Sequence, residues 1–166
     1  MSALDKDRQF RSIVIPKETN NLIISKIVEG GYYRCHLDSE FNGNYSTTIF
    51  LNEPNEYVGG ELQLLIDGNL KNIKLKAGWG VTYATGIPHQ VLDVTEGVRY
   101  ASIFWSTSII LDPFMREIHH NLTNIQDKLV KADNAANKVY SNLKEFADDP
   151  VYEIEMLKKN IARRYL

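Results

Sequence analysis

The sequence predicts a mainly β protein with a jelly-roll core and C-terminal α-helices. Short β-rich segments recur at regular spacing between about residues 10 and 108, with Gly, Pro and Asn turn signals between them. From Asp112 onward the chain is polar, with apolar residues at helical spacing. About eight short strands in this arrangement are typical of a closed or two-sheet β architecture, whose mouth can hold a ligand. Strand spacing alone does not distinguish a jelly roll from a cupin. The length of 166 residues suggests a single domain, 1–166, with the β core at about 10–108 and the helical region at about 112–166.

The first strands flank a turn rich in asparagine. We predict a short strand over Arg11–Ile15 that ends at Pro16, a turn over Lys17–Asn21, and a second strand over Asn21–Val28. Gly30 and Gly31 then turn the chain into the next β-rich segment, which ends near Ser39.

The rest of the β core alternates strands with loops. Ser39–Asn44 and Asn52–Gly60 are predicted loops, and Asp67-Gly68 predicts a hairpin turn. The predicted strands are Tyr45–Leu51, Glu61–Ile66, Leu70–Leu75, Val81–Tyr83, His89–Val94 and Val98–Trp105.

Two helical stretches complete the chain. Apolar residues at helical spacing predict helix between Pro113 and Phe146, with Asp112 as its N-cap and Pro113 at its first position. Asp148-Asp149-Pro150 breaks this stretch, and a last helix is predicted from about Val151 to Tyr165.

Composition restricts the classes of function. The formal net charge of −2 provides no basic footprint, so nucleic-acid binding is not expected. A single cysteine excludes an intrachain disulfide and fits a reducing compartment. No signal peptide and no apolar run of membrane-spanning length is visible in the sequence. We expect a cytoplasmic protein that does not bind a membrane, or one that leaves the cell by a route the sequence does not show.

The segment from Gly31 to Ser39 carries a candidate metal-binding pair. Aromatic and polar residues alternate along it, which indicates a strand, so His36 and Asp38 project from the same face. An imidazole and a carboxylate on one face form two thirds of the His-His-carboxylate triad that holds non-haem Fe(II) and leaves open positions. His89 is the best candidate for the third ligand. By itself the H-x-D pattern is weak evidence for a metal, and the alternative is a surface histidine beside a strand-end aspartate.

Arg99 is the one cation on an otherwise apolar predicted strand, Val98–Trp105. A buried guanidinium needs an anion, and a dicarboxylate ligand would supply one with bidentate geometry. The alternative is a structural ion pair with one of the chain's own acids.

The order H-x-D, then His89, then Arg99 about ten residues later resembles the Fe(II)/2-oxoglutarate oxygenases, and within them the prolyl-4-hydroxylase-like PKHD-type hydroxylases. Four segments and the C-terminal helix carry the resemblance: Tyr33–Asp38, Ser46–Leu62, Ala77–His89, Val94–Ser108 and Leu157–Tyr165. The resemblance implies a double-stranded β-helix core and a dioxygenase that uses Fe(II), 2-oxoglutarate and O₂, with ascorbate as a candidate reductant.

The resemblance assigns roles to individual residues. His36, Asp38 and His89 would be the catalytic iron ligands, and Arg99 would bind the distal carboxylate of 2-oxoglutarate. Relatives often place tyrosines near the co-substrate where this chain has Ile27 and Phe50. Residues that could supply a hydroxyl instead are Tyr33, Thr48 and Tyr83.

Other notable side chains have simpler interpretations. His119 and His120 are adjacent on a predicted helix and therefore face different ways, which favours solvated surface. Cys35 should face away from the iron, and Trp105 is expected in packing or in the pocket wall. The loops Ser39–Asn44 and Asn52–Tyr57 are candidate lids over the site.

The resulting hypothesis is a dioxygenase that hydroxylates an unactivated C–H bond. The expected substrate is a peptidyl proline or another protein side chain, and a small molecule is the next alternative. A homodimer is one expected arrangement. The alternative from a different class is a non-catalytic jelly-roll module that senses iron or a small acid.

Overall fold

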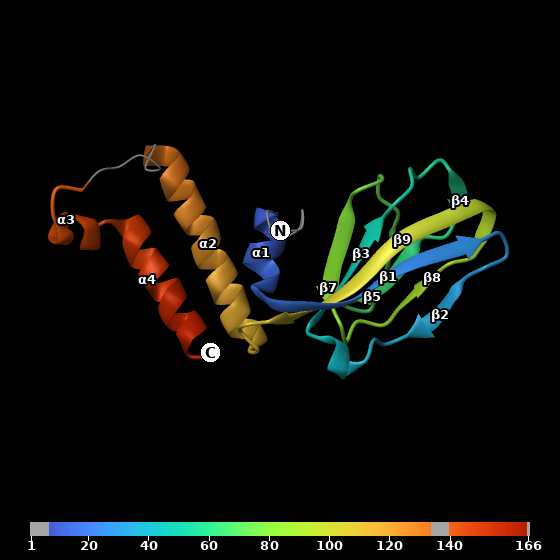
Figure 1. Cartoon of the computed structure of the whole chain (residues 1–166), viewed down its shortest axis with the longest axis horizontal. Helices are drawn as coiled ribbons and strands as arrows, with labels where there is room; N and C mark the ends of the chain where they lie inside the picture. The colour runs from blue at the N-terminus through green and yellow to red at the C-terminus, as the bar shows by residue number, and fades with distance from the viewer. Residues whose placement is uncertain (1–6, 134–139, 166) are drawn as a thin grey trace. The chain divides into compact units, whose positions relative to one another are not determined.

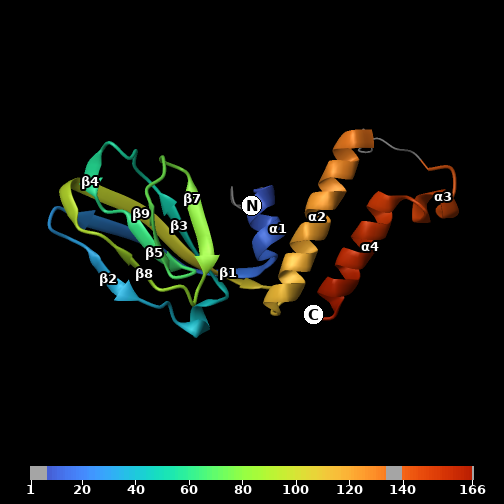
Figure 2. The ribbon, with the colours of Figure 1, turned by 180° about the vertical axis from the view of Figure 1, so that it is seen from behind.

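The computed structural model describes residues 7–133 and 140–165 (Figures 1 and 2). The chain folds as two compact units. The first, which we call the β unit, is formed by Pro16–Ser108, and the second, the helical unit, is formed by Met1–Ile15 together with Ile109–Leu166. Each unit has its own internal packing.

The β unit consists of two antiparallel sheets. One has the strand order β1-β9-β3-β7, with β4 paired to β9, and the other has the order β2-β8-β5-β6. Apart from the β5–β6 hairpin, neighbouring strands in the two sheets are not consecutive in sequence, which is the crossover pattern of a jelly roll. The strands are β1 (Pro16–Val28), β2 (Tyr33–His36), β3 (Tyr45–Phe50), β4 (Tyr57–Gly59), β5 (Leu62–Ile66), β6 (Asn69–Ile73), β7 (Gly80–Ala84), β8 (His89–Val91) and β9 (Val94–Ser108).

The core of the β unit lies between the two sheets. Phe50 and Tyr83 from the first sheet pack against Leu62 and Leu64 from the second, and all four are buried. Along β5 the buried Leu62 and Leu64 alternate with the more exposed Gln63 and Leu65, so this strand presents one face to the core. The mainly β jelly-roll prediction is confirmed.

Most predicted strands are present, but the N-terminal prediction is wrong in two places. Arg11–Ile15 is not a strand: α1 (Arg8–Val14) is a helix, with Asp7 accepting a hydrogen bond from the Phe10 amide at 2.7 Å. The helix ends at Ile15, whose φ of 48° is left-handed. Lys17–Asn21 is not a turn either, because β1 extends through it and pairs with β9 across two register shifts.

Two further elements differ from the sequence prediction. The loop over Ser39–Asn44 contains a short 3-10 helix at Glu40–Asn42, and the loop over Asn52–Gly60 contains β4. Strand β4 is only three residues long and pairs with the start of β9. Its own sequence is too short to show the alternation that predicts a strand.

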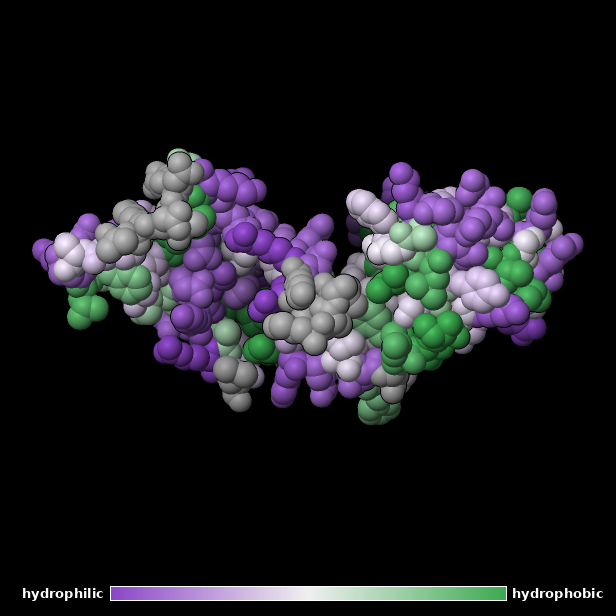
Figure 3. Space-filling model, turned by 45° about the horizontal axis from the view of Figure 1, so that its top comes forward, coloured by the Kyte–Doolittle hydropathy of each residue, from purple (hydrophilic) through white to green (hydrophobic). Residues whose placement is uncertain are grey.

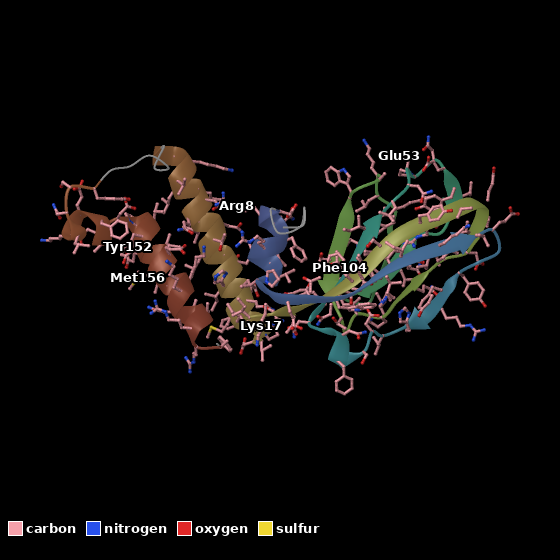
Figure 4. The ribbon with its side chains drawn as sticks, viewed as in Figure 1. Arg8, Lys17, Glu53, Phe104, Tyr152 and Met156 are labelled. Carbon is pink, nitrogen blue, oxygen red and sulfur yellow. The ribbon has the colours of Figure 1, made fainter. Side chains whose placement is uncertain are left out.

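The helical unit contains α1, α2 (Pro113–Asp133), α3 (Leu143–Ala147) and α4 (Pro150–Arg163). Helix α2 packs against α4 and against α1. Arg8 of α1, labelled in Figure 4, forms an ion pair with Asp127 of α2. The predicted cap at Asp112 is present, because its carboxylate accepts a hydrogen bond from the Met115 amide at 3.0 Å. Within the predicted Pro113–Phe146 helix, residues 134–139 lie outside the described residues.

Exposed apolar side chains are unevenly distributed. Figure 3 shows hydrophobic residues gathered on the visible side of the β unit, whereas the helical unit is largely hydrophilic in that view. Strand β1 contributes exposed Leu22, Ile24 and Val28. No helix within residues 7–133 and 140–165 combines the length and apolar character needed to cross a membrane.

Candidate metal centre and co-substrate cavity

The structure brings His36, Asp38 and His89 together at one end of the β2–β8 pair, with Asp38 in the segment that follows β2. His36 ends β2 and His89 begins β8, and the two are directly opposite each other in this antiparallel pair. Nε2 of His36 lies 3.6 Å from one carboxylate oxygen of Asp38, and Nε2 of His89 lies 3.6 Å from the other. One donor atom from each residue falls within a cluster no wider than 4.8 Å.

Both imidazoles are oriented by backbone carbonyls. Nδ1 of His36 donates to the Arg34 carbonyl oxygen at 2.8 Å, and Nδ1 of His89 donates to the Ile87 carbonyl oxygen at 2.9 Å. Because Nδ1 carries the proton in each case, the Nε2 lone pairs are free and face Asp38. Burial lowers the pKa of His89, which favours the neutral form that binds a metal.

Asp38 is held by a third strand. The hydroxyl of Ser46, on β3, donates a hydrogen bond of 2.5 Å to Oδ2 of Asp38. Ser46 is completely buried, and Asp38 itself is largely buried. Such a partner fixes the orientation of a ligating carboxylate before any metal arrives.

The donor set matches the chemistry of a non-haem iron centre. Two neutral imidazole nitrogens and one carboxylate oxygen, all on one side, leave coordination positions free for other ligands. The oriented Nδ1–H groups and the Ser46 hydroxyl supply the outer contacts that such ligands require. The residues present therefore fit the metal that the sequence suggested.

A cavity of about 170 Å³ adjoins the three donors, between the two sheets of the β unit. Its walls come from both sheets, including β1 of the first, and they are mainly apolar. The lining residues are Ile23, Ser25, Ile27, Tyr33, His36, Asp38, Thr48, Leu62, Tyr83, His89, Val91, Arg99, Ile103 and Trp105.

Arg99 lines this cavity and is only 1% exposed. No acid within the described residues forms an ion pair with its guanidinium, and its Nε has no hydrogen-bond partner there. Burial lowers the pKa of Arg99, while Tyr57 and Tyr83 oppose that effect. The guanidinium carbon lies 5.4 Å from the centre of the Phe50 ring. A buried cation without an internal counter-charge is suited to an anionic ligand, and the structural ion pair considered from the sequence is absent from the described part of the chain.

The three candidate hydroxyl groups occupy different parts of the cavity. Thr48 and Tyr83 are buried in its walls, whereas Tyr33 is more than half exposed and its ring packs edge-on against His36. Burial raises the pKa of Tyr83, with Asp38 acting in the same direction, so its hydroxyl stays protonated and can donate. Tyr83 also contacts the ring of His89, with centroids 5.0 Å apart. Tyr83 and Thr48 are therefore better placed for an enclosed ligand, and Tyr33 for one at the entrance.

Other residues considered from the sequence lie apart from this cluster. Cys35 is exposed, and His119 and His120 are on α2 in the helical unit. His120 contacts Ser12 and Asn124 through its two ring nitrogens. Trp105 lines the cavity, in agreement with its expected place in the wall.

Sequence reasoning missed Ser46 and the contribution of β1. Strand alternation could have indicated Ser46, because it shares a face of β3 with Thr48 and Phe50, and Thr48 is one of the predicted candidates. Ile23, Ser25 and Ile27 show the same alternation on β1. Ile27 lies directly opposite Arg99 in the β1–β9 pair.

Comparison with known proteins identifies the family. Residues 22–107 match the model of the 2OG-Fe(II) oxygenase superfamily. A PKHD-type hydroxylase of Rippkaea orientalis is 30% identical over 155 residues, covering 86% of this chain and 70% of the relative. A PKHD-type hydroxylase of Thermosynechococcus vestitus is 35% identical over 158 residues, with the same coverage of 86% and 70%.

A solved structure agrees with these sequence matches. A prolyl-4-hydroxylase from Pseudomonas putida is similar with a TM-score of 0.52 at 25% identity, over 64% of this chain and 63% of that one. The chain therefore belongs to the 2OG-Fe(II) oxygenase superfamily, among the PKHD-type hydroxylases, dioxygenases that use Fe(II), 2-oxoglutarate and O₂.

Proposed function

We propose that the protein hydroxylates a peptidyl proline or another protein side chain, with His36, Asp38 and His89 as its iron ligands. The observation that carries this proposal is the cavity that joins the three donors to a buried arginine with no ion pair among residues 7–133 and 140–165. Its substrate class is supported by the names of the similar proteins, which are PKHD-type hydroxylases and a prolyl-4-hydroxylase. With iron and 2-oxoglutarate bound, the centre inserts one atom of O₂ into a C–H bond and converts the co-substrate to succinate and CO₂.

The chain's own residues bind and orient the reactants. Arg99 takes the distal carboxylate of 2-oxoglutarate through charge-assisted hydrogen bonds, which the low dielectric of its buried position strengthens. Tyr83 and Thr48 provide hydroxyl groups in the same enclosed space. The Nδ1–H bonds of His36 and His89 hold both Nε2 atoms toward one point.

The substrate approaches at the rim beside His36. This side chain is 30% exposed, while those of Asp38 and His89 are almost enclosed, so the cluster opens on the His36 side. The exposed Tyr33 ring beside His36 offers a flat apolar surface to the incoming residue. The apolar walls of Ile23, Ile103 and Val91 keep water away from the reacting C–H bond.

The test is co-substrate turnover followed by product analysis. Fe(II)-dependent conversion of 2-oxoglutarate to succinate is expected in the wild type and lost in His36→Ala. A panel of peptides, including proline-rich ones, and of small metabolites is then searched by mass spectrometry for products heavier by one oxygen atom. Hydroxylated peptides support the proposed substrate class, and hydroxylated small molecules alone contradict it. Absence of any turnover, coupled or uncoupled, would leave the non-catalytic module as the better description.

A further inference from the structure

Arg99 has no acid beside it among the described residues, so something else must hold its side chain in place. Strand β4 is followed by Gly60, whose backbone lies directly beside the arginine stem. We propose that Tyr57 and Gly60 are positioning residues that fix the Arg99 guanidinium for a dicarboxylate co-substrate. This inference rests on the proposed function, because it concerns the same end of the cavity.

The first observation is the lack of room for a side chain at Gly60. Its φ is +66°, and a Cβ atom there would lie 3.2 Å from Cδ of Arg99, 3.1 Å from Cε2 of Tyr57 and 2.9 Å from Cγ2 of Val94. The arginine stem therefore passes through space that any other residue would need. Gly60 lets the backbone pack directly against the Arg99 side chain and restrict its position.

The second observation concerns buried polar atoms. Tyr57 is 3% exposed, and its hydroxyl has no hydrogen-bond partner in the described part of the chain, a property it shares with Nε of Arg99. Burial raises the pKa of Tyr57, and Arg99 is the next largest influence, acting in the opposite direction. The phenol and the guanidinium are thus close neighbours, and a hydrogen bond between them contributes to the pKa of each although its geometry falls short of a well-formed bond.

The third observation is that the segment itself is fixed. The ammonium of Lys74 lies 3.9 Å from the centre of the Tyr57 ring and donates a hydrogen bond of 2.8 Å to the Tyr57 carbonyl oxygen. On the other side Tyr57 pairs with Gly97 of β9, where a Cβ would lie 2.6 Å from the Glu56 carbonyl oxygen. A fixed ring and a fixed backbone provide a rigid support for the arginine.

The consequence is a division of tasks within the site. The three metal donors are held by β2, β8 and Ser46, whereas Arg99 is held by β4 and the glycine that follows it. A change at Gly60 should therefore weaken binding at the arginine end and leave the metal end intact.

The experiment compares Gly60→Ala with Gly68→Ala. Both glycines have a left-handed φ, +66° and +75°, so both substitutions strain the backbone, but no atom lies within 4 Å of a Cβ at Gly68. Calorimetry on the Mn(II)-loaded protein would measure the Kd of 2-oxoglutarate and the Kd of pyruvate. Pyruvate has the same metal-chelating 2-oxo acid group but lacks the distal carboxylate.

In Gly60→Ala we expect the Kd of 2-oxoglutarate to rise about tenfold, at the lower end of what loss of a supporting contact causes. The Kd of pyruvate and that of Mn(II) should stay at their wild-type values, and Gly68→Ala should match the wild type throughout. Equal weakening of both 2-oxo acids, an equal effect in Gly68→Ala, or wild-type affinity in Gly60→Ala would overturn the inference.

A second variant decides the matter if Gly60→Ala does not fold. Tyr57→Phe keeps the ring and removes only the hydroxyl, so a severalfold loss of 2-oxoglutarate affinity with unchanged pyruvate binding is expected. Wild-type affinity in this variant would then reject the inference. If the wild type itself binds pyruvate and Mn(II) but no 2-oxoglutarate, the proposed function fails instead.

Discussion

The β unit and the helical unit treat their polar side chains in opposite ways. In the β unit Arg99, His89 and Thr48 are buried around one cavity, and Arg99 has no internal counter-charge among the described residues. In the helical unit the ion pair of Arg8 with Asp127 and that of Lys159 with Glu155 lie at the surface. Exposed pairs contribute little to stability, whereas buried polar groups are costly unless something satisfies them. The buried cation of the β unit is therefore expected to lower the stability of the ligand-free protein, and it lies where a ligand is expected.

The largest expected effect comes from removing a metal donor. His36→Ala should lower turnover by about three orders of magnitude or more, because the centre would lose one of the three protein ligands proposed for it. His120→Ala, in the helical unit, removes an imidazole that hydrogen-bonds only within that unit and should leave turnover within about twofold of the wild type. Succinate production by both variants measures the contrast, and a comparable loss in His120→Ala would contradict it.

Substitution of Arg99 should weaken co-substrate binding but stabilise the ligand-free fold. Arg99→Met should raise the KM for 2-oxoglutarate about a hundredfold, since charge-assisted hydrogen bonds to the co-substrate are lost. The same change should raise the free energy of unfolding of the ligand-free protein by about 1 kcal/mol, because a buried unpaired cation is replaced by an apolar side chain of similar length. Urea unfolding checks the second effect, and a destabilised Arg99→Met variant would show that the cation is satisfied in the free protein.

A smaller effect is expected at the hydroxyl that holds Asp38. Ser46→Ala should weaken Fe(II) or Mn(II) binding about tenfold, since the carboxylate loses the contact that orients it. Ser106→Ala is the matched control, because Ser106 is an equally buried serine whose nearest hydroxyl partner is Thr19, at 3.4 Å. Metal titration of the two variants, without co-substrate, separates them, and equal affinities would argue against a role for Ser46.

The smallest expected effect belongs to the helical unit and depends on pH. The pKa of His119 is lowered, chiefly by burial and next by Lys158, so the folded protein binds a proton less readily than the unfolded chain. Stability conferred by neutral His119 is therefore complete above 6.5, its ordinary pKa, and declines as the pH falls below that value. His119→Gln should remove this part of the acid sensitivity, whereas His120→Gln should not. Thermal unfolding between pH 7.5 and 5 measures the difference, and parallel curves for wild type and His119→Gln would refute the assignment.

Local alternation was enough to predict the faces of the strands, and hence the most informative part of the site. His36 and Asp38 do reach one cluster as predicted, although β2 ends at His36 and Asp38 lies in the segment after it. On β9, Arg99, Ile103 and Trp105 occupy alternating positions and line the same cavity. What alternation cannot predict is which strands become neighbours. The direct pairing of His36 with His89, and the reach of Ser46 to Asp38, depend on the crossover order of the sheets.

The wrong predictions have physical causes that lie outside the mispredicted segments themselves. Arg11–Ile15 is rich in β-branched residues, yet the cap at Asp7 and the left-handed Ile15 make the segment helical. The asparagine-rich Lys17–Asn21 resembles a turn, but pairing with the long β9 draws it into β1 by way of irregularities in register. Strand β4 depends on Gly97, whose missing side chain lets the two strands approach.

The arrangement of donors around Asp38 also determines how the protein must be prepared. Two imidazoles and one carboxylate have no intrinsic preference for iron: affinity for such a set increases from Fe²⁺ through Co²⁺ and Ni²⁺ to Cu²⁺. Because the Nδ1–H bonds and Ser46 orient these donors before loading, competing divalent ions meet a site that is already formed. A preparation passed over a nickel column is therefore expected to carry Ni²⁺, an inert ion, in place of Fe²⁺. Its measured specific activity will then reflect the fraction of sites free of nickel, until the nickel is stripped and replaced by Fe²⁺ under anaerobic conditions.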